Sequence, residues 1–272
     1  MKIEEAINFG QKMLSTVERP RFEAEILLSF VLKKDRVFLH LNSDKTLEEK
    51  DESLYINLLK KRAKNYPLEY ITKRVSFYSE EFFIEEGVLI PRPETELLVD
   101  RVLENVNKDK NLTIAEIGIG SGVVSIILAK KLKNAKIIAT DISKKALSVA
   151  KKNIQKHKVE DKIKLLNCSF LDLVDEKVDI IVSNPPYIAK DYKLDENVMF
   201  EPKEALFGGG KGDEMLKEII DLAIKREVKL LACEMGYDQK KSISKYSQKN
   251  GLRPIFYKDL AGFDRGFIIK VH

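Results

Sequence analysis

Residues 112–122 read Leu-Thr-Ile-Ala-Glu-Ile-Gly-Ile-Gly-Ser-Gly, and this stretch carries the strongest fold signal in the chain. Its first half, 112–117, is a short apolar run of the kind that forms a buried strand. Its second half is a Gly-x-Gly-x-Gly loop that leads into a helical apolar pattern at 123–132. Glycines allow a tight turn and a close approach by a ligand, and the following helix adds unpaired N–H groups. The stretch therefore predicts a strand, a ligand-binding loop and a helix.

Strand and helix patterns alternate from this stretch to the end of the chain. Helices are predicted after Ser143, at 215–224 and near 238–249. Strands are predicted at 137–140, 163–166, 178–182, 228–233, 252–257 and 267–271. Such alternation indicates an α/β domain with a mostly parallel sheet and helices on both faces. Ligands bind such sheets at the carboxyl ends of the strands.

The N-terminal part of the chain has a different character. Residues 1–73 show helical apolar spacing and no strand-like alternation, so they predict a small helical domain. Short β-prone runs follow at 75–78, 82–84 and 88–90, with a turn expected at 85–87. We expect residues 74–92 to form a β-hairpin linker and residues 93–272 to form the α/β domain, whose first helix Pro93 opens.

The composition limits the partners and ligands of the chain. It has 272 residues, 44% of them hydrophobic, with a net charge of +5. This modest excess indicates a solvated, lysine-rich surface and does not require a nucleic-acid partner. Cys168 and Cys233 lie in or beside apolar runs and form no Cys-x-x-Cys pair, so no metal is expected. The chain starts without a signal-peptide pattern and has no apolar stretch near the ~20 residues of a membrane span, so we expect a cytoplasmic protein.

Asp141 is the first candidate ligand-binding side chain outside the loop. It ends a predicted strand, 19 residues after Gly122. A carboxylate at a spacing of roughly 20 residues can accept hydrogen bonds from both ribose hydroxyls. Val123 occupies the place where a dinucleotide-binding loop has its third glycine, which weakens a nicotinamide interpretation. We predict nucleoside binding; the alternative is a tight turn that only caps a helix.

The sequence Asn184-Pro185-Pro186-Tyr187 follows the strand predicted at 178–182. The two prolines stiffen the loop, so the Asn184 side chain and the Pro185 carbonyl become fixed hydrogen-bond acceptors, and Tyr187 offers a flat face. Two acceptors that hold both hydrogens of an –NH₂ group orient its nitrogen for attack on a sulfonium methyl. The loop therefore predicts methylation of a planar amide or amine nitrogen; the alternative is a rigid proline turn.

These motifs resemble those of the HemK-type protein-(glutamine-N5) methyltransferases, which modify the glutamine of the Gly-Gly-Gln motif in peptide-chain release factors. The resemblance covers nearly the whole chain, and its most specific part is Ile90-Pro91-Arg92-Pro93-Glu94-Thr95-Glu96. The other matching segments are Arg21–Leu28, Pro67–Ile71, Asn184–Ile188, Glu201-Pro202 with Ala205-Leu206 and Gly208–Gly210, and Asp259–Arg265.

The resemblance implies a class I S-adenosylmethionine-dependent methyltransferase fold, which is Rossmann-like with a seven-stranded, mostly parallel sheet. It implies S-adenosyl-L-methionine as cofactor and release factors as protein substrates. The residues it implies for cofactor binding are Gly118, Ile119, Gly120, Ser121, Gly122, Asp141, Phe170 and Asn184. Those it implies for holding the glutamine and for catalysis are Asn184, Pro185, Pro186 and Tyr187.

Two further expectations come with the resemblance. Arg92 and Glu96 are expected either to brace the pocket entrance or to form a structural ion pair. Ser169 stands before Phe170 where family members often carry Asp. A backbone or hydroxyl acceptor would then meet the adenine amine in place of a carboxylate.

Three other functions share parts of this pattern. A related branch methylates a glutamine of a ribosomal protein, and other enzymes with Asn-Pro-Pro-Tyr methylate exocyclic amines of bases, which must be flipped out of a duplex. A non-catalytic cofactor sensor or RNA-binding module is the third. The segment Pro91–Glu96 and the helical domain favour release factors. We expect a monomer without direct nucleic-acid binding.

Overall fold

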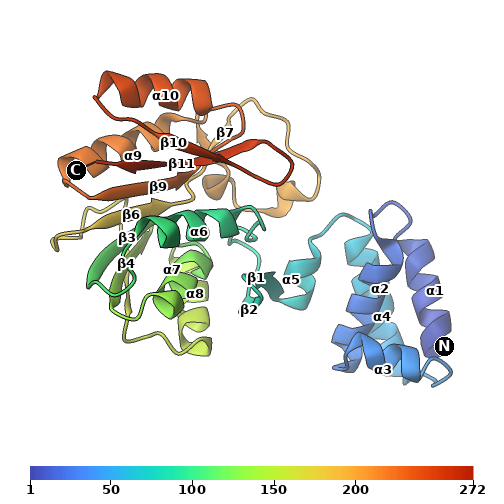
Figure 1. Cartoon of the computed structure of the whole chain (residues 1–272). Helices are drawn as coiled ribbons and strands as arrows, with labels where there is room; N and C mark the ends of the chain where they lie inside the picture. Colours follow the sequence, from blue (N-terminus) through green and yellow to red (C-terminus); the bar gives the residue numbers. More distant parts are fainter. Residues whose placement is uncertain (272) are drawn as a thin grey trace. The chain divides into compact units, whose positions relative to one another are not determined.

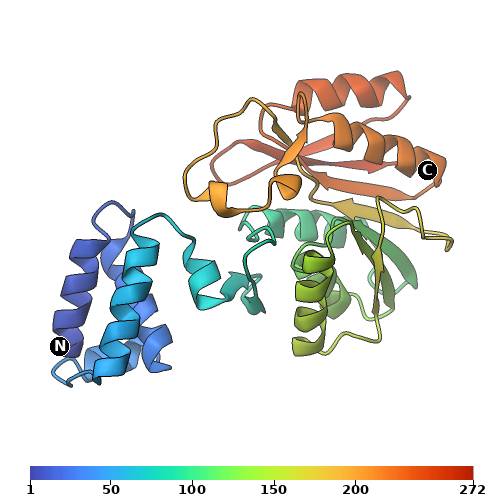
Figure 2. The same ribbon diagram turned by 180° about the vertical axis from the view of Figure 1, so that it is seen from behind.

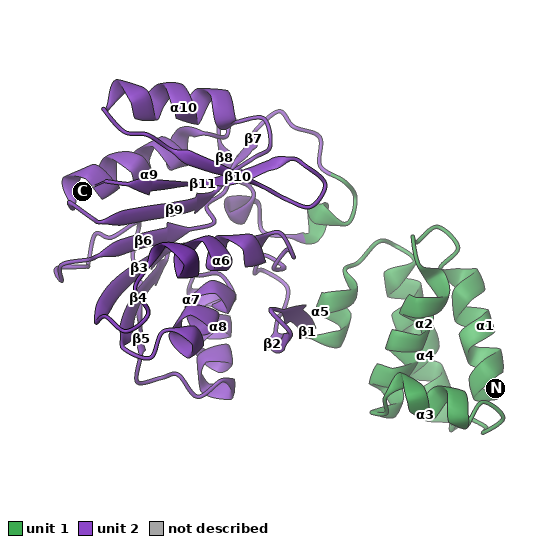
Figure 3. Ribbon diagram, viewed as in Figure 1, with its two compact units in different colours: residues 1–74, 195–200 green, residues 75–194, 201–272 purple. Residues whose placement is uncertain are grey.

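The computed structural model describes residues 1–271, and His272, the last residue of the predicted α/β domain, lies outside them. The chain divides into two compact units (Figures 1 and 3). Unit 1 holds Met1–Arg74 together with the short segment Asp195–Phe200, and unit 2 holds Val75–Leu194 and the chain from Glu201 onward.

Unit 2 is built on a seven-stranded sheet, as predicted. Its strand order is β10 (Ile255–Lys258), β11 (Asp264–Lys270), β9 (Leu230–Glu234), β6 (Ile180–Ser183), β3 (Leu112–Ile117), β4 (Ala135–Asp141) and β5 (Ile163–Asn167). The pairs from β9 to β5 are parallel, and β11 is antiparallel to both of its neighbours. The predicted strand at 252–257 starts only at Ile255 because Pro254 lacks an N–H for the ladder.

Helices cover both faces of this sheet because successive strand residues point to opposite sides (Figures 1 and 2). On one face, Ile180 and Val182 of β6 share a core with α6 (Thr95–Asn105), α7 (Val123–Lys131) and α8 (Lys144–Lys156). On the other face, Ile181 packs in a second core with α9 (Glu214–Lys225) and α10 (Lys240–Lys249). The predicted α/β architecture is therefore confirmed.

The hairpin before α6 differs in detail from the prediction. Its strands are β1 (Arg74–Phe77) and β2 (Glu80–Phe83), and the turn between them is Tyr78-Ser79, with φ values of 55° and 60°. Both residues have the positive φ that a two-residue hairpin turn requires. A turn does lie at Glu86-Gly87, within the expected turn at 85–87, but it joins no second strand, because the strand expected at 88–90 is wrong and these residues form none.

Unit 1 contains the predicted helices and no named strand other than the first residue of β1 within its described residues. The helices are α1 (Ile3–Met13), α2 (Pro20–Leu32), α3 (Arg36–Leu41), α4 (Glu49–Arg62) and α5 (Leu68–Thr72). Their apolar faces share one core. The segment Asp195–Phe200 joins this unit through the contact between Phe200 and Tyr66, whose ring centroids lie 5.3 Å apart. No helix within residues 1–271 combines the length and apolar character that crossing a membrane requires.

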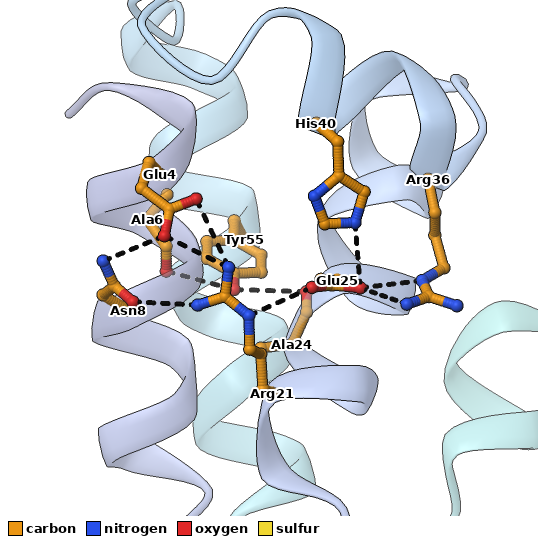
Figure 4. A network of polar contacts seen from close by, with 9 residues as sticks. All are labelled: Glu4, Ala6, Asn8, Arg21, Ala24, Glu25, Arg36, His40 and Tyr55. Carbon is orange, nitrogen blue, oxygen red and sulfur yellow. Dashed lines mark hydrogen bonds and ion pairs between the residues drawn. The ribbon is translucent and has the colours of Figure 1, made fainter.

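A buried carboxylate organises the polar side of unit 1 (Figure 4). Glu25 on α2 has a side chain that is 3% exposed, and it accepts a hydrogen bond from Arg36 Nε at 2.8 Å. Arg21 and His40 lie 3.3 and 3.7 Å from the same carboxylate. A buried charge needs such partners because desolvation is costly. Glu25 therefore links α2 to α3.

Gly10 marks the closest approach of α1 to its neighbours. A Cβ at this position would overlap the hydroxyl of Tyr55 and lie 2.8 Å from the Cβ of Ala24. The Tyr55 hydroxyl itself donates to the carbonyls of Ala6 or Ala24, both 3.2 Å away, so it cannot move without losing these partners.

We predict that Gly10→Ala destabilises the protein by about 1–3 kcal/mol through overpacking. In an uncrowded helix interior the same change would stabilise it by up to ~1 kcal/mol. Thermal and urea unfolding measure the difference. Gln11→Ala, at an exposed neighbouring position of α1, is the control and should change stability by less than about 0.5 kcal/mol. Equal or greater stability of Gly10→Ala would contradict the close packing.

Candidate active site

The glycine loop between β3 and α7 is shaped as the sequence predicts. Gly118 and Gly120 have φ values of 75° and 54°, which favour glycine. A Cβ at either position would meet no atom within 4 Å, so both glycines border open space. The backbone N–H groups of Gly118 and Ile119 donate to the Thr140 carbonyl at the end of β4, 2.9 and 3.0 Å away. The loop is therefore tied to the neighbouring strand while one side stays accessible.

Glu116, near the end of β3, holds the two ends of the glycine loop together. Its carboxylate is buried and accepts hydrogen bonds from both the backbone N–H and the hydroxyl of Ser125 on α7. Burial raises the pKa of Glu116 to about 8, although the bonds from Ser125 favour the ionised form. This contact ties the end of β3 to the first turn of α7, the two elements on either side of the glycine loop.

Asp141 lies beside the loop at the end of β4. One carboxylate oxygen accepts from the Gly120 N–H at 3.0 Å and the other from the Ser143 N–H at 2.8 Å. Burial raises the pKa of Asp141, and these backbone donors oppose the shift. Each carboxylate oxygen has a second lone pair, so the group is held in place with acceptor sites left for a ligand. Ser143 also caps α8, as predicted.

The Asn184-Pro185-Pro186-Tyr187 loop leaves the end of β6. Asn184 Nδ2 donates to Thr95 Oγ1 at 3.2 Å, and the Tyr187 carbonyl accepts from Gln239 Nε2 at 2.8 Å. The loop continues into β7 (Ile188–Ala189), which pairs with β8 (Phe207–Gly209). A Cβ on Gly208 would overlap the Pro186 carbonyl, so only glycine allows this approach. The glycine run at 208–210 thus supports the back of the loop.

A buried carboxylate stands behind this loop. Glu234, the last residue of β9, accepts hydrogen bonds from Thr95 Oγ1 at 2.7 Å and from the Tyr187 hydroxyl at 3.1 Å. Burial raises the pKa of Glu234 to about 7, against the effect of these two donors and of nearby Arg265. Burial and the same carboxylate raise the pKa of Tyr187.

One pocket connects these motifs. Its free volume, which includes solvent-filled space at the open mouth, is about 820 Å³. Six predicted site residues line it: Gly118, Gly120, Asp141, Phe170, Asn184 and Pro186. The pocket also includes Cys168 and Ser169, so the segment with the atypical serine faces the same space.

Five predicted site residues are absent from the lining of this pocket among residues 1–271. Ile119, Ser121 and Pro185 are buried, and Gly122 caps α7 with a φ of 89°. They shape the two loops. The fifth, Tyr187, was expected to offer a flat face to the substrate, but its hydroxyl bonds to Glu234 and its ring does not line the pocket.

Arg92 and Glu96 each bind a different segment. Arg92 forms an ion pair with the buried Glu201, whose other oxygen accepts from the Ile90 N–H at 2.9 Å. Glu96 accepts from the Tyr78 N–H at 2.7 Å. Neither residue lines the pocket, and no ion pair joins them to each other within the described chain. Their contacts hold residues 90–96 against the hairpin and against the segment at 201.

Several site residues were missed by the sequence analysis. Gly87 of the predicted turn and Val88 and Leu89 of the wrongly predicted strand all line the pocket. Thr95 bonds Asn184 and Glu234 bonds Tyr187, both in the Asn184-Pro185-Pro186-Tyr187 loop. A signal for Glu234 existed, since it ends an apolar parallel strand as Asp141 does. No sequence signal ties Thr95 to Asn184, because only the fold brings the start of α6 beside the loop after β6. Within residues 1–271 no group of three His, Cys, Asp or Glu side chains is arranged to hold a metal ion.

Comparison with known proteins agrees with this geometry. Residues 5–72 match the PrmC N-terminal domain and residues 93–212 match the methyltransferase small domain. The release factor glutamine methyltransferase of Clostridium botulinum is 36% identical over 94% of both chains. That of Coxiella burnetii is 36% identical over 99% of both chains. This chain belongs to the release factor glutamine methyltransferase family. A third member, from Dictyoglomus turgidum, is 45% identical over 75% of this chain and 73% of its own.

Solved structures support the fold. A ribosomal protein L11 methylase from Lactobacillus delbrueckii subsp. bulgaricus superposes with a TM-score of 0.52 over 70% of this chain and 84% of its own, at 24% identity. The hMettl16 catalytic domain bound to a MAT2A 3'UTR hairpin superposes with a TM-score of 0.59 over 90% and 91%, at 15% identity. With the strand order of the sheet, these similarities confirm the predicted class I methyltransferase fold.

We predict that Glu116 makes the stability of the protein depend on pH. Its pKa is higher in the folded state, so the folded protein keeps a proton that the unfolded chain loses above about pH 4.5. The stability contributed by protonated Glu116 is therefore lost as the pH rises toward about 8. Between these pH values, Glu116→Gln should lose less stability than the unsubstituted protein, by on the order of a few kcal/mol.

Urea unfolding at about pH 5.5 and about pH 8.5 tests this prediction. Glu160→Gln, which removes an exposed carboxylate, is the control and should leave the pH dependence unchanged. If Glu116→Gln loses as much stability between the two pH values as the unsubstituted protein, the assignment to Glu116 is wrong.

Proposed function

We propose that this chain transfers a methyl group from S-adenosyl-L-methionine to the side-chain amide nitrogen of the glutamine in the Gly-Gly-Gln motif of peptide-chain release factors. Membership of the release factor glutamine methyltransferase family supports the substrate class. The observation that carries the chemistry is that Asn184 and Pro186 border the same pocket as Gly118, Gly120 and Asp141. The proposed nucleoside site therefore lies in the same pocket as part of the stiff Asn184-Pro185-Pro186-Tyr187 loop, which we call the acceptor loop.

The residues of the pocket suit the cofactor. Gly118 and Gly120 leave room for a ligand against the backbone, and Asp141 keeps carboxylate acceptor sites for ribose hydroxyls. Phe170 offers an aromatic side chain and Ser169 a hydroxyl at the expected adenine side, where the family often has Asp. When bound, the cofactor supplies an electrophilic methyl group on a positively charged sulfur. The buried, partly anionic surroundings of Asp141 favour a cationic ligand.

An amide nitrogen is a weak nucleophile, and the acceptor loop compensates by orienting it with hydrogen bonds. Asn184 Nδ2 is engaged by Thr95, so Asn184 Oδ1 is the atom left to accept from the substrate. The Pro185 carbonyl is proposed as the second acceptor, although Pro185 is buried and does not line the pocket, and Pro186 adds an apolar wall to the pocket. Positioning of this kind can reduce a barrier by roughly 7–11 kcal/mol. The proton leaves after transfer, when the nitrogen has become acidic, so no strong base is required.

The proposal assigns a function to each of the three predicted parts of the chain. Residues 1–73 would form the helical substrate-binding domain, 74–92 the hairpin linker and 93–272 the methyltransferase domain; the compact units divide near the first of these boundaries. A protein substrate requires no direct nucleic-acid binding. We propose a monomer that acts in the cytoplasm, where release factors meet ribosomes; sedimentation of the purified chain tests the monomer.

Methyl transfer from labelled cofactor to a purified release factor tests the proposal. Label should appear on the wild-type factor and be absent when the glutamine of its Gly-Gly-Gln motif is replaced by Ala. Ribosomal protein and duplex DNA serve as alternative acceptors in parallel reactions. No label, or label that is unaffected by the Gln→Ala change, would refute the release-factor assignment.

Asn184→Ala should lower turnover by several hundredfold, since loss of one preorganised polar group typically costs roughly 10²–10³ in rate. Cofactor binding, measured by calorimetry, should weaken much less, because Gly118, Gly120 and Asp141 stay in place. Asn111→Ala, at an exposed position before β3, is the matched control. Near-normal turnover of Asn184→Ala would show that this side chain does not hold the acceptor.

A further inference from the structure

A line of hydrogen bonds reaches Asn184 from the side away from the pocket. Asn184 Nδ2 lies 3.2 Å from Thr95 Oγ1, which lies 2.7 Å from Glu234 Oε2. The second oxygen of Glu234 accepts from the Tyr187 hydroxyl at 3.1 Å. Thr95 is 3% exposed and Glu234 is 2% exposed, so the hydrogen bond between them is shielded from water. The other three residues in this series, Thr95, Glu234 and Tyr187, come from α6, β9 and the loop after β6, and Thr95 is the one that bonds Asn184.

Counting hydrogens decides which end of the Asn184 amide faces Thr95. A threonine hydroxyl has a single hydrogen, and an ionised carboxylate can only accept. The Thr95 hydrogen therefore goes to Glu234, and Thr95 offers only lone pairs to Asn184. The –NH₂ end of Asn184 satisfies these lone pairs. The opposite orientation would place two oxygens together without a hydrogen between them, and an unsatisfied buried group costs about 1–3 kcal/mol.

We propose that Thr95 and Glu234 are positioning residues that set the orientation of the Asn184 amide, so that its oxygen and not its nitrogen faces the substrate. The proposal rests on the proposed function, in which the substrate presents an –NH₂ group. An Asn184 turned the other way would offer N–H donors to the N–H donors of the substrate. It would then repel the acceptor amide instead of holding it.

The environment of Glu234 supports an active role. Its burial raises the pKa of Glu234 to about 7. A desolvated carboxylate is therefore kept in contact with the acceptor loop at a cost in stability. The titratable groups that act on it come from several elements: Glu94 before α6, Arg265 on β11, Tyr187 after β6, and Tyr257 on β10. As an acid, Glu234 can donate to Thr95. That frees the Thr95 hydrogen to bond Asn184 Oδ1 and turn the amide.

Nuclear magnetic resonance of the full chain tests the orientation without any substrate. In protein labelled with nitrogen-15 at asparagine, the Asn184 side-chain signals are those lost in Asn184→Ala. Slow amide exchange is expected for this group in the unsubstituted protein and in Thr95→Ser, which keeps the hydroxyl. Thr95→Val, which has the same shape without the hydroxyl, should show fast exchange. Unchanged Asn184 signals in Thr95→Val would overturn the proposal, whatever the substrate of the enzyme.

Kinetics with the release factor give the second readout. Thr95→Val should lower kcat roughly 10- to 100-fold, the usual effect of losing a group that orients a ligating side chain, with little change in cofactor affinity. Thr95→Ser should keep most of the rate. Thr113→Val, at the far end of β3, makes the same chemical change as a control. Equal rates for Thr95→Val and the unsubstituted protein, or equal defects in Thr95→Ser and Thr95→Val, would refute the positioning role.

The pH profile separates Glu234 from a merely structural group. Turnover of the unsubstituted protein should fall as the pH drops through about 7, because protonation of Glu234 releases the Thr95 hydrogen. Glu234→Gln should lack this fall, since its amide does not titrate; the same fall in Glu234→Gln would exclude Glu234. An unsubstituted enzyme that labels no release factor contradicts the proposed function alone, and the exchange measurement then still decides the orientation.

Discussion

The parallel alignment of three neighbouring strands is the constraint on which the site depends. Ile117 of β3 lies in register with Thr140 of β4 on one side and Ser183 of β6 on the other. The residue after each of these is a ligand-binding candidate: Gly118, Asp141 and Asn184. Hydrogen bonding between the strands therefore brings together groups that are up to 66 residues apart. Any shift of register between these strands would separate the acceptor loop from the glycine loop.

Buried polar groups maintain this edge of the sheet. Asn153 of α8 holds both the N–H and the carbonyl of Phe83 in the hairpin, and it also donates to the Ser121 carbonyl in the glycine loop at 2.8 Å. Glu116 joins the two sides of the glycine loop, and Glu201 fixes the segment before α6. Each of these side chains would be costly to bury alone. Glu116 is satisfied by Ser125 in α7, Asn153 by backbone groups of the hairpin and the glycine loop, and Glu201 by the Ile90 N–H and by Arg92, so these segments are held by interactions that only the folded arrangement completes.

Close backbone packing complements these bonds. Gly208 and Gly212 leave no room for a Cβ against the carbonyls of Pro186 and Tyr187. The two prolines stiffen the acceptor loop from within, and the glycines allow β8 and the following turn to support it from behind. Stiffness is useful here because an acceptor that positions a weak nucleophile must not relax when the substrate arrives. The Asn184 side chain is itself held by the hydrogen bond from its Nδ2 to Thr95.

The amino-acid sequence by itself determined the class of the fold and named six of the residues that line the pocket. Strand–helix alternation, the glycine loop, Asp141 and the Asn-Pro-Pro-Tyr motif are local patterns, and local conformation follows from spacing, glycine and proline. The hairpin turn was misplaced because its positive φ angles fall on Tyr78 and Ser79, which carry no glycine or proline signal. Thr95 and Glu234 were decided only by the tertiary structure. They lie 89 and 50 residues from Asn184 along the chain, and hydrogen bonds between distant residues exist only after the sheet has formed and α6 has packed against it.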